Sequence, residues 1–297
     1  MRVVALGDLH ANFPLLWRIL RREGLADAGF RPTEALRSGR VRLVLLGDLV
    51  HPKTPRDYAR LTGLEAYDPE DPFHLRLAAG AQIRELFRLK AFQEEAGDHV
   101  TILLGNHEAA LLEGSPILGN RHLKHLEFHP EHGGKALPEA LRSWMASFPK
   151  ELVLKGVHFA HVGPVPWLQE YDGLFYAQSE AKTWWFLTPE YVERMGYRYG
   201  VYGHTPMPDG ILLKDRFALI DALDLGELGF EVGGPATGCP GYADELLLKV
   251  WLYGYLEKVR ATRPLERACR ERLGLIWLTG DQAPDHNTLW RFWQRHR

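Results

Sequence analysis

Three short apolar segments of this chain each end in a glycine that is followed by a side chain able to bind a metal ion. The three junctions are Gly7-Asp8, Gly47-Asp48 and Gly105-Asn106, at the ends of residues 2–7, 41–46 and 100–104. Short apolar segments that contain β-branched residues predict buried strands. Strands that alternate with helices build an open α/β sheet. These three segments therefore restrict the fold more strongly than any other feature of the sequence.

Helical patterns separate these strands. One begins at Pro14 and brings apolar side chains to one face every three or four residues, and another covers residues 73–95. In an open α/β sheet, the loops beyond the carboxyl ends of the strands form the binding site. We therefore expect the three junctions to meet in one site.

The later part of the chain predicts a second sheet. Residues 151–154 and 157–160 have strand patterns on either side of a Lys155-Gly156 turn. Three further strands are predicted, at residues 199–202, 210–213 and 217–221. His161 follows one of these strands and His204 follows another, so the second sheet also ends in residues that can bind a metal.

Composition narrows the class of protein. The chain has 297 residues, of which 45% are hydrophobic and 11% aromatic, enough for a large core. No stretch approaches the ~18 to 20 apolar residues of a membrane span, and the two cysteines are too few for a disulfide framework. A net charge of −2 gives no general attraction for nucleic acid. We expect a soluble, cytoplasmic protein with no membrane partner, and we do not expect nucleic acid as its main partner.

A break in composition falls at residues 233–241, which are rich in glycine and proline. Helical patterns follow at residues 244–260, 264–275 and 288–295. We therefore predict a main domain over residues 1–234, a linker over 235–245 and a helical extension over 246–297.

The polar residues after the strands form a set of metal donors. They are Asp8, His10, Asp48, Asn106, His161 and His204. Two carboxylates, three imidazoles and one amide suit divalent cations that accept both oxygen and nitrogen ligands, and they are enough for two ions with positions left for water and substrate.

The motifs GDLH, GD, GNHE, a late histidine after a strand, and GHTP occur in that order over residues 1–232. In this order they resemble the calcineurin-like metallophosphoesterases, on the phosphoprotein phosphatase and diadenosine tetraphosphatase side. The resemblance implies an α/β fold in which two mixed β-sheets are sandwiched between helices. It also implies one metal on Asp8, His10 and Asp48, and a second on Asp48, Asn106, His161 and His204, with Asp48 bridging.

The resemblance further implies an activity. Two cations roughly 3.5 to 4 Å apart lower the pKa of a shared water, and the hydroxide so formed attacks a phosphate ester or phosphoanhydride. His107, beside a predicted ligand, would act as the general acid. We expect Mn²⁺ first, with Fe, Zn, Ni or Co as other metals. The substrate would be a phosphorylated small molecule, a nucleotide or a phosphoprotein.

The second motif departs from the family pattern. In the phosphoprotein phosphatase branch it reads GDxVDRG, where the second aspartate orients the catalytic histidine and the arginine holds phosphate. Here His51 and Pro52 stand at those two positions, and we interpret His51 as a structural or surface residue. Another cation must bind the phosphate, and the candidates are Lys53, Arg56 and Lys182.

His132 is an alternative to His161, because it precedes two glycines in a pattern that the family also uses. We prefer His161, since His132 follows no apolar segment. An inactive scaffold that only binds metal stays open as an alternative function, because the second aspartate and the arginine are missing.

The extension over residues 246–297 resembles the N-terminal helical region of insertion-sequence transposases. This resemblance implies a fragment without transposase activity. Alternatively, the extension is native and buries its apolar face on the main domain or in self-association. Its basic, aromatic character also leaves open a nucleic-acid-binding module, which added salt would weaken steeply.

Overall fold

The computed structural model describes residues 2–115, 117–118, 123–166, 171, 185, 187–206, 211–221, 244–257, 259, 261–272, 275, 279 and 283–296. The chain divides into two compact units, residues 1–222 and 223–297. Most of the predicted linker, residues 235–243, lies outside the described residues. Within the described residues, no helix has the length and apolar character needed to span a bilayer.

The first sheet contains β1 (Arg2–Leu6), β2 (Val41–Leu45) and β3 (Val100–Ile102), all parallel and in that order. Leu6 pairs with Leu45, and Leu45 pairs with Ile102, so the strands end level with one another. The loops that carry the three predicted junctions therefore leave the same edge of the sheet.

The second sheet has the order β6-β7-β8-β10-β9. Its strands are β6 (Glu151–Leu154), β7 (Val157–Ala160), β8 (Tyr199–Tyr202), β9 (Leu212–Leu213) and β10 (Phe217–Leu219). The three central strands are parallel, while β6 and β9 pair in the antiparallel sense. The predicted turn between β6 and β7 is confirmed, with φ of 49° at Lys155 and 79° at Gly156.

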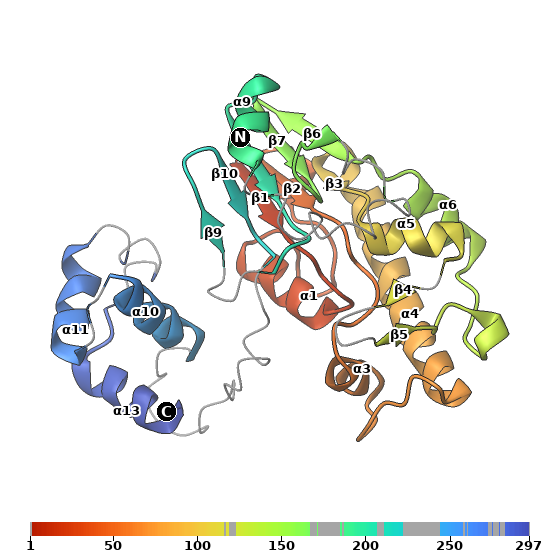
Figure 1. Ribbon diagram of the computed structural model, residues 1–297, viewed down its shortest axis with the longest axis horizontal. Helices are drawn as coiled ribbons and strands as arrows, with labels where there is room; N and C mark the ends of the chain where they lie inside the picture. Colours follow the sequence, from red (N-terminus) through yellow and green to blue (C-terminus); the bar gives the residue numbers. More distant parts are fainter. Residues whose placement is uncertain are drawn as a thin grey trace. The chain divides into compact units, whose positions relative to one another are not determined.

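The two sheets pack face to face between helices (Figure 1). The core between the sheets contains Val44, Leu46, Leu103 and Phe159. On the other face of the first sheet, Leu43 and Leu45 belong to a core shared with α1 (Phe13–Arg22) and α4 (Pro72–Ala96). On the other face of the second sheet, Tyr202 packs with Val192 of α9 (Thr188–Arg194). The predicted sandwich is confirmed, and it follows from strand side chains that alternate between two faces.

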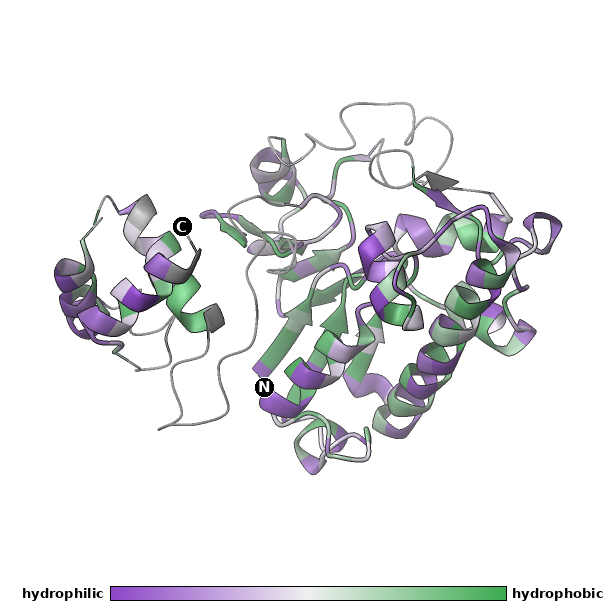
Figure 2. Ribbon diagram, turned by 90° about the horizontal axis from the view of Figure 1, so that it is seen from below, coloured by the Kyte–Doolittle hydropathy of each residue, from purple (hydrophilic) through white to green (hydrophobic). Residues whose placement is uncertain are grey.

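Hydropathy follows this arrangement. Figure 2 shows the strands of the two sheets mostly in the colour of apolar residues, whereas the helices around them carry both colours. A strand between two layers is buried on both faces, and a covering helix is buried on one.

Several elements were not predicted. They are α2 (Glu34–Arg37), α3 (Pro55–Thr62), η1 (Gly97–His99), α5 (Asn106–Glu113), β4 (Ile117–Leu118), β5 (Lys124–His125), η3 (Pro130–His132), α6 (Glu139–Ala146) and α9. The most consequential is α5, because it begins at Asn106, where we expected a loop. Glu108 accepts a hydrogen bond from the Gly105 N–H at 3.1 Å and so starts this helix directly after the junction.

The C-terminal unit contains α10 (Asp244–Leu256), α11 (Thr262–Glu271) and α13 (His286–His296). Its core contains Leu247, Leu248, Val250, Leu265, Ala268, Cys269, Leu275, Leu289 and Phe292. The Trp251 indole N–H donates to the Leu289 carbonyl at 3.1 Å, which ties α10 to α13. The described apolar side chains of α10 therefore pack within this unit, a point that sequence alone had left open.

A chain that ends at Gly234 should therefore keep the main unit folded. Each unit has its own apolar core, so we expect the melting temperature of the main unit to change by less than about 4 °C, or about 1 kcal/mol. Calorimetry and metal analysis of the truncated and full-length chains provide the measurement. A truncated chain that is folded but inactive or without metal would show that the extension contributes to the site.

Candidate metal centre

The structure brings the six predicted donors together at the carboxyl ends of the strands. Asp8 and His10 follow β1, Asp48 follows β2, Asn106 begins α5 after β3, His161 follows β7, and His204 follows β8. Asp48, Asn106 and His161 are buried. Five strand ends from two sheets thus supply one site.

Four donor atoms form a compact group. Oδ1 of Asn106 lies 3.0 Å from Nε2 of His161 and 2.9 Å from Nδ1 of His204. Nε2 of His161 lies 3.2 Å from Nδ1 of His204 and 3.4 Å from Oδ2 of Asp48. Ligands about 2.1 Å from one ion lie roughly 3.0 to 3.5 Å from each other, so this group has the spacing of a metal site.

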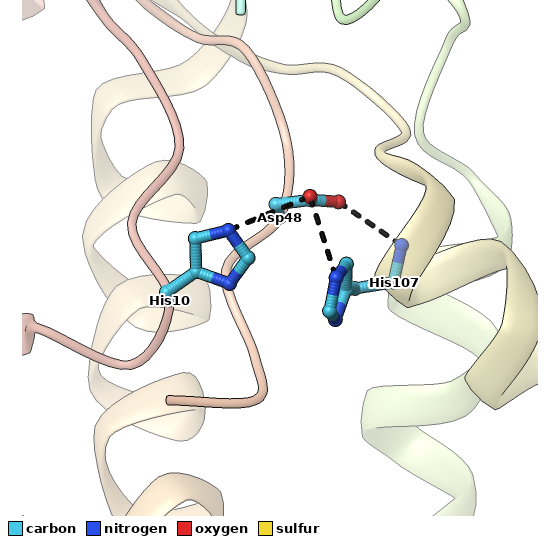
Figure 3. A group of neighbouring side chains, drawn as sticks. All are labelled: His10, Asp48 and His107. Atoms are coloured by element: carbon cyan, nitrogen blue, oxygen red, sulfur yellow. Dashed lines mark hydrogen bonds and ion pairs between the residues drawn. The ribbon is translucent and has the colours of Figure 1, made fainter. Parts of the chain in front are cut away.

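A second group shares the same carboxylate oxygen (Figure 3). Oδ2 of Asp48 lies 3.7 Å from Nε2 of His10 and 3.8 Å from Nε2 of His107. Oδ2 of Asp8 lies 3.8 Å from Nε2 of His10. His107 thus lies as near to Asp48 as His10 does, and it could serve either as a ligand or as an acid beside the metals.

Backbone carbonyls set the tautomers of two donor histidines. Nδ1 of His10 lies 2.9 Å from the His51 carbonyl, and Nδ1 of His161 lies 2.9 Å from the Leu46 carbonyl. A carbonyl only accepts, so Nδ1 carries the proton and the neutral ring has its lone pair on Nε2. Nε2 is the atom that faces Asp48 in both residues, as metal ligation requires.

The loop after β2 is held from two sides. The Asp48 carbonyl accepts from Leu9 N at 3.0 Å and from His10 N at 2.7 Å, and Oδ1 of Asp48 accepts from His107 N at 3.0 Å. A Cβ added to Gly105 would lie 2.3 Å from Asp48 N, so only glycine allows this approach.

Glu108 is the most important residue that sequence reasoning missed. Its carboxylate is fully buried and accepts from the backbone N–H groups of Asp48, Leu49, Val50 and Gly105, at 2.8, 2.7, 3.3 and 3.1 Å. Burial, with the charge of Asp48, raises the pKa of Glu108 to about 7. Its place at the third position of α5 was the available signal, because acids there cap helices.

The electrostatics of the cluster favour a cation. Burial raises the pKa of Asp8 well above its ordinary value, and the charge of Asp221 raises it further. Burial lowers the pKa of His161, but Asp48 and Asp8 outweigh this and raise the pKa to about 10. Buried carboxylates that draw positive charge so strongly, next to lone pairs of imidazole and amide groups, fit a divalent metal.

One candidate cation lies at the cluster. Nζ of Lys53 lies 2.9 Å from Oδ1 of Asp221, a buried residue that we did not predict. Burial lowers the pKa of His10, and the Lys53 ammonium lowers it further, so this charge acts on a donor histidine. Arg56 is exposed on α3, and Lys182 lies outside the described residues.

Other histidines lie on the surface or beside the donors. His132 is exposed on η3, with its ring next to His129, whereas His161 is buried among the donors. His51, which we interpreted as a structural or surface residue, is buried. The rings of His51 and His125 lie beside His107, with centroids 5.2 and 5.5 Å from that of His107. His125 carried no sequence signal, since isolated histidines are common, whereas His51 stands at the position of the second aspartate of the GDxVDRG pattern.

A buried set of carboxylate, imidazole and amide donors at the carboxyl edge of two packed sheets is a group that could hold divalent metal ions. The chain belongs to the calcineurin-like phosphoesterase family, whose model matches residues 1–208. Residues 207–295 match the model of a transposase domain (DUF772), which confirms the resemblance of the extension. Family membership supports metal-dependent hydrolysis of a phosphate ester with divalent metal ions.

Solved structures with some similarity include a cold-active protein-tyrosine phosphatase of a psychrophilic Shewanella, 16% identical, covering 74% of this chain and 70% of that one with a TM-score of 0.45. Another is a metallophosphoesterase from Sphaerobacter thermophilus, 14% identical, with a TM-score of 0.39. That match covers 74% of this chain and 75% of the other. A protein serine/threonine phosphatase from Saccharomyces cerevisiae is 11% identical, covering 73% and 66% with a TM-score of 0.41. Comparison with curated proteins finds no significant match.

Replacing Glu108 by Gln should destabilise the fold. One carboxylate oxygen becomes an NH₂ group, which faces two backbone donors and leaves them without an acceptor. At about 1 to 3 kcal/mol for each of the two buried donors, we expect a loss of roughly 2 to 6 kcal/mol in the free energy of unfolding. Urea denaturation measures it, with Glu113→Gln at the exposed end of the same helix as the control. Equal stability of the two variants would contradict the role of Glu108.

Proposed function

We propose that the chain is a binuclear metallophosphoesterase that hydrolyses a phosphate ester or phosphoanhydride. The position of Oδ2 of Asp48 carries the proposal, since it lies 3.4 Å from Nε2 of His161 and 3.7 Å from Nε2 of His10. One carboxylate oxygen between two groups of donors is the arrangement that a bridging ligand requires.

The proposed ligands divide between two ions. One ion would be held by Asp8, His10 and Asp48, and the other by Asp48, Asn106, His161 and His204. Mixed oxygen and nitrogen donors suit Mn²⁺, which we propose first, with Fe, Zn, Ni or Co as other metals. When bound, such ions supply Lewis acidity and an activated water.

His107 is proposed as the general acid. Nε2 of His107 faces Oδ2 of Asp48 at 3.8 Å, and only 11% of the side chain is exposed. Burial lowers the pKa of His107 even though Asp48 opposes the shift. The imidazolium form is therefore a stronger acid than in water, which suits donation of a proton to a leaving oxygen.

Lys53 is proposed as the phosphate-binding cation. Its ion pair with Asp221 holds the ammonium beside the donors, and 16% of the side chain is exposed, so a substrate oxygen can reach it. The pair takes the place of the arginine that the GDxVDRG pattern would supply. Phosphate esters of small molecules, nucleotides and phosphoproteins all carry the oxygens that it would bind.

Residues 1–234 are proposed to carry the activity, and the extension over 246–297 is proposed to be a fragment without a catalytic role. Every proposed ligand lies in the first unit, residues 1–222. The exposed Trp290 and Trp293 on α13, with Arg291 between them, favour nucleic-acid binding as the second candidate function of the extension. Loss of RNA or DNA binding on truncation, with unchanged hydrolysis, would separate the two activities.

Asp48→Asn should weaken both metal sites together. An amide oxygen is neutral and bridges two cations poorly, so we expect metal content to fall below one ion per chain and activity to fall by about a hundredfold or more. Elemental analysis and a phosphatase screen with Mn²⁺ measure these effects, and Asp98→Asn, an exposed aspartate, is the control. Full activity of a preparation with less than one metal per chain would refute the binuclear centre.

His107→Ala should keep both metals and slow turnover by ~10² to 10⁴ for alkyl phosphates. An activated aryl phosphate needs little protonation of its leaving oxygen, so its loss should be smaller. His132→Ala is the control for loss of a histidine. Equal losses on both substrates would leave only an electrostatic role, and loss of metal would make His107 a ligand.

Lys53→Ala should raise KM for phosphate substrates by about tenfold or more, with metal content unchanged, because it removes a charge that contacts phosphate and not the metals. Arg56→Ala, on the exposed face of α3, should leave KM within about twofold. Inhibition by inorganic phosphate gives an independent measure. If Arg56→Ala raises KM more than Lys53→Ala does, Arg56 and not Lys53 binds the phosphate.

A further inference from the structure

The His51 side chain contacts Nδ1 of His107, the ring nitrogen that does not face Asp48. Nδ1 of His51 lies 3.0 Å from Nδ1 of His107, whereas Nε2 of His107 faces Oδ2 of Asp48 (Figure 3). We propose that His51 is a positioning residue, whose Nδ1 accepts a hydrogen bond from His107 and holds that ring with Nε2 toward Asp48. This inference rests on the general-acid role proposed for His107.

Proton balance requires such an acceptor. A histidine that donates from Nε2 first carries protons on both nitrogens, so Nδ1–H of His107 needs a partner. In the step, a hydroxide oxygen derived from water bonds to phosphorus while the P–O bond to the leaving group breaks. The leaving oxygen keeps the electron pair of that bond and takes the proton from Nε2 of His107, whose N–H bond breaks. Neutral His107 still donates Nδ1–H to His51 afterwards, so the ring keeps its orientation throughout.

The His51 side chain is directed at His107 and at no other hydrogen-bonding group in the described part of the chain. The residue is buried, and its Nε2 has no hydrogen-bond partner there. Burial of a polar ring is unfavourable unless its polar atoms are bonded. An apolar side chain would fill the same space without this cost, so the imidazole is explained by its one contact.

Neighbouring groups fix the His51 ring. Its backbone N–H donates to Oε1 of Gln82 at 2.9 Å, and its ring stacks on His125 with centroids 4.7 Å apart and planes at 14°. His125 is itself oriented, because Nδ1 lies 2.7 Å from the Tyr58 hydroxyl, which donates its own proton to Glu127. His125 must therefore donate to Tyr58, and the ring under His51 cannot turn freely.

His51 stands where the GDxVDRG pattern has its second aspartate. A neutral imidazole accepts the same hydrogen bond as a carboxylate but stabilises the imidazolium of His107 less. The link from His51 to the metal side uses its backbone carbonyl, which accepts from Nδ1 of His10. A change of the His51 side chain therefore leaves that link in place.

The test compares two substitutions in the full-length, metal-loaded chain. His51→Leu removes the acceptor, and His51→Asn keeps an oxygen near the position of Nδ1. For an alkyl phosphate we expect His51→Leu to lower kcat by about tenfold to a hundredfold, with KM within about twofold and metal content unchanged. We expect His51→Asn to recover most of kcat and His132→Leu to have no effect. Unchanged kcat in His51→Leu, or no recovery in His51→Asn when both variants are folded, would overturn the proposal.

A double variant tests whether the two histidines act together. His51→Leu/His107→Ala should be no slower than His107→Ala alone, because a positioning residue acts only through its partner. Multiplied losses would show that His51 acts independently and would overturn the proposal.

NMR of the metal-free, ¹⁵N-histidine-labelled chain separates this inference from the general-acid role. The Nδ1 proton of His107 should be observed in the wild type and in His51→Asn and be lost in His51→Leu. If His107→Ala slows both substrate types equally, the general-acid role fails, and this signal alone decides on His51. An identical His107 signal in His51→Leu would overturn the positioning role.

Discussion

The Glu108 carboxylate joins two loops that are about 60 positions apart in the sequence. It accepts backbone hydrogen bonds from the loop after β2 and from Gly105 at the start of α5. Because the donors belong to the backbone, this one side chain sets both the position of Asp48 and the first turn of α5. That turn carries Asn106 and His107, so the proposed bridging ligand, an amide donor and the proposed acid all depend on the same buried contact.

The site is also where the backbone is most strained. Seven non-glycine residues in the described part of the chain have positive φ, and five of them belong to the loops of the site: His10, Ala11, Asp48, His51 and His204. Each such residue costs of order 1 to 3 kcal/mol. The hydrogen bonds around them offset this cost, as when Asp8 accepts from His204 N at 3.0 Å. A Cβ on the preceding Gly203 would lie 2.3 Å from Oδ1 of Asp8, which explains the glycine of the GHTP motif. Sharp turns aim several donors at one point, which extended loops could not do.

The charges at the site favour the binding of a metal ion and of phosphate. The carboxylates of Asp8 and Asp48 are buried. Burial is the main cause that raises the pKa of Asp8, and the charge of Asp221 is the second. The Lys53 ammonium, paired with Asp221, is the positive charge that we propose binds phosphate. A site with two buried carboxylates and a lysine ammonium can accept a metal ion and a phosphoryl group together. This agrees with the family match, which supports a metal-dependent phosphoesterase.

Much of the fold and of the donor set could be predicted because the signals are local. The strands of the two large sheets show apolar patterns, the turn between β6 and β7 has its own Lys155-Gly156 signal, and the donors follow strand ends where loops converge. The start of α5 was missed because Gly105-Asn106 reads as a turn, and only a carboxylate three residues later makes it a helix. Sequence by itself therefore determined the sandwich and which residues reach its edge. Tertiary structure alone decided which of them touch: Lys53 meets Asp221 across 168 positions, and His51 meets His107 across 56. Pairings at that distance depend on how two sheets and a helix pack, and no local pattern records that packing.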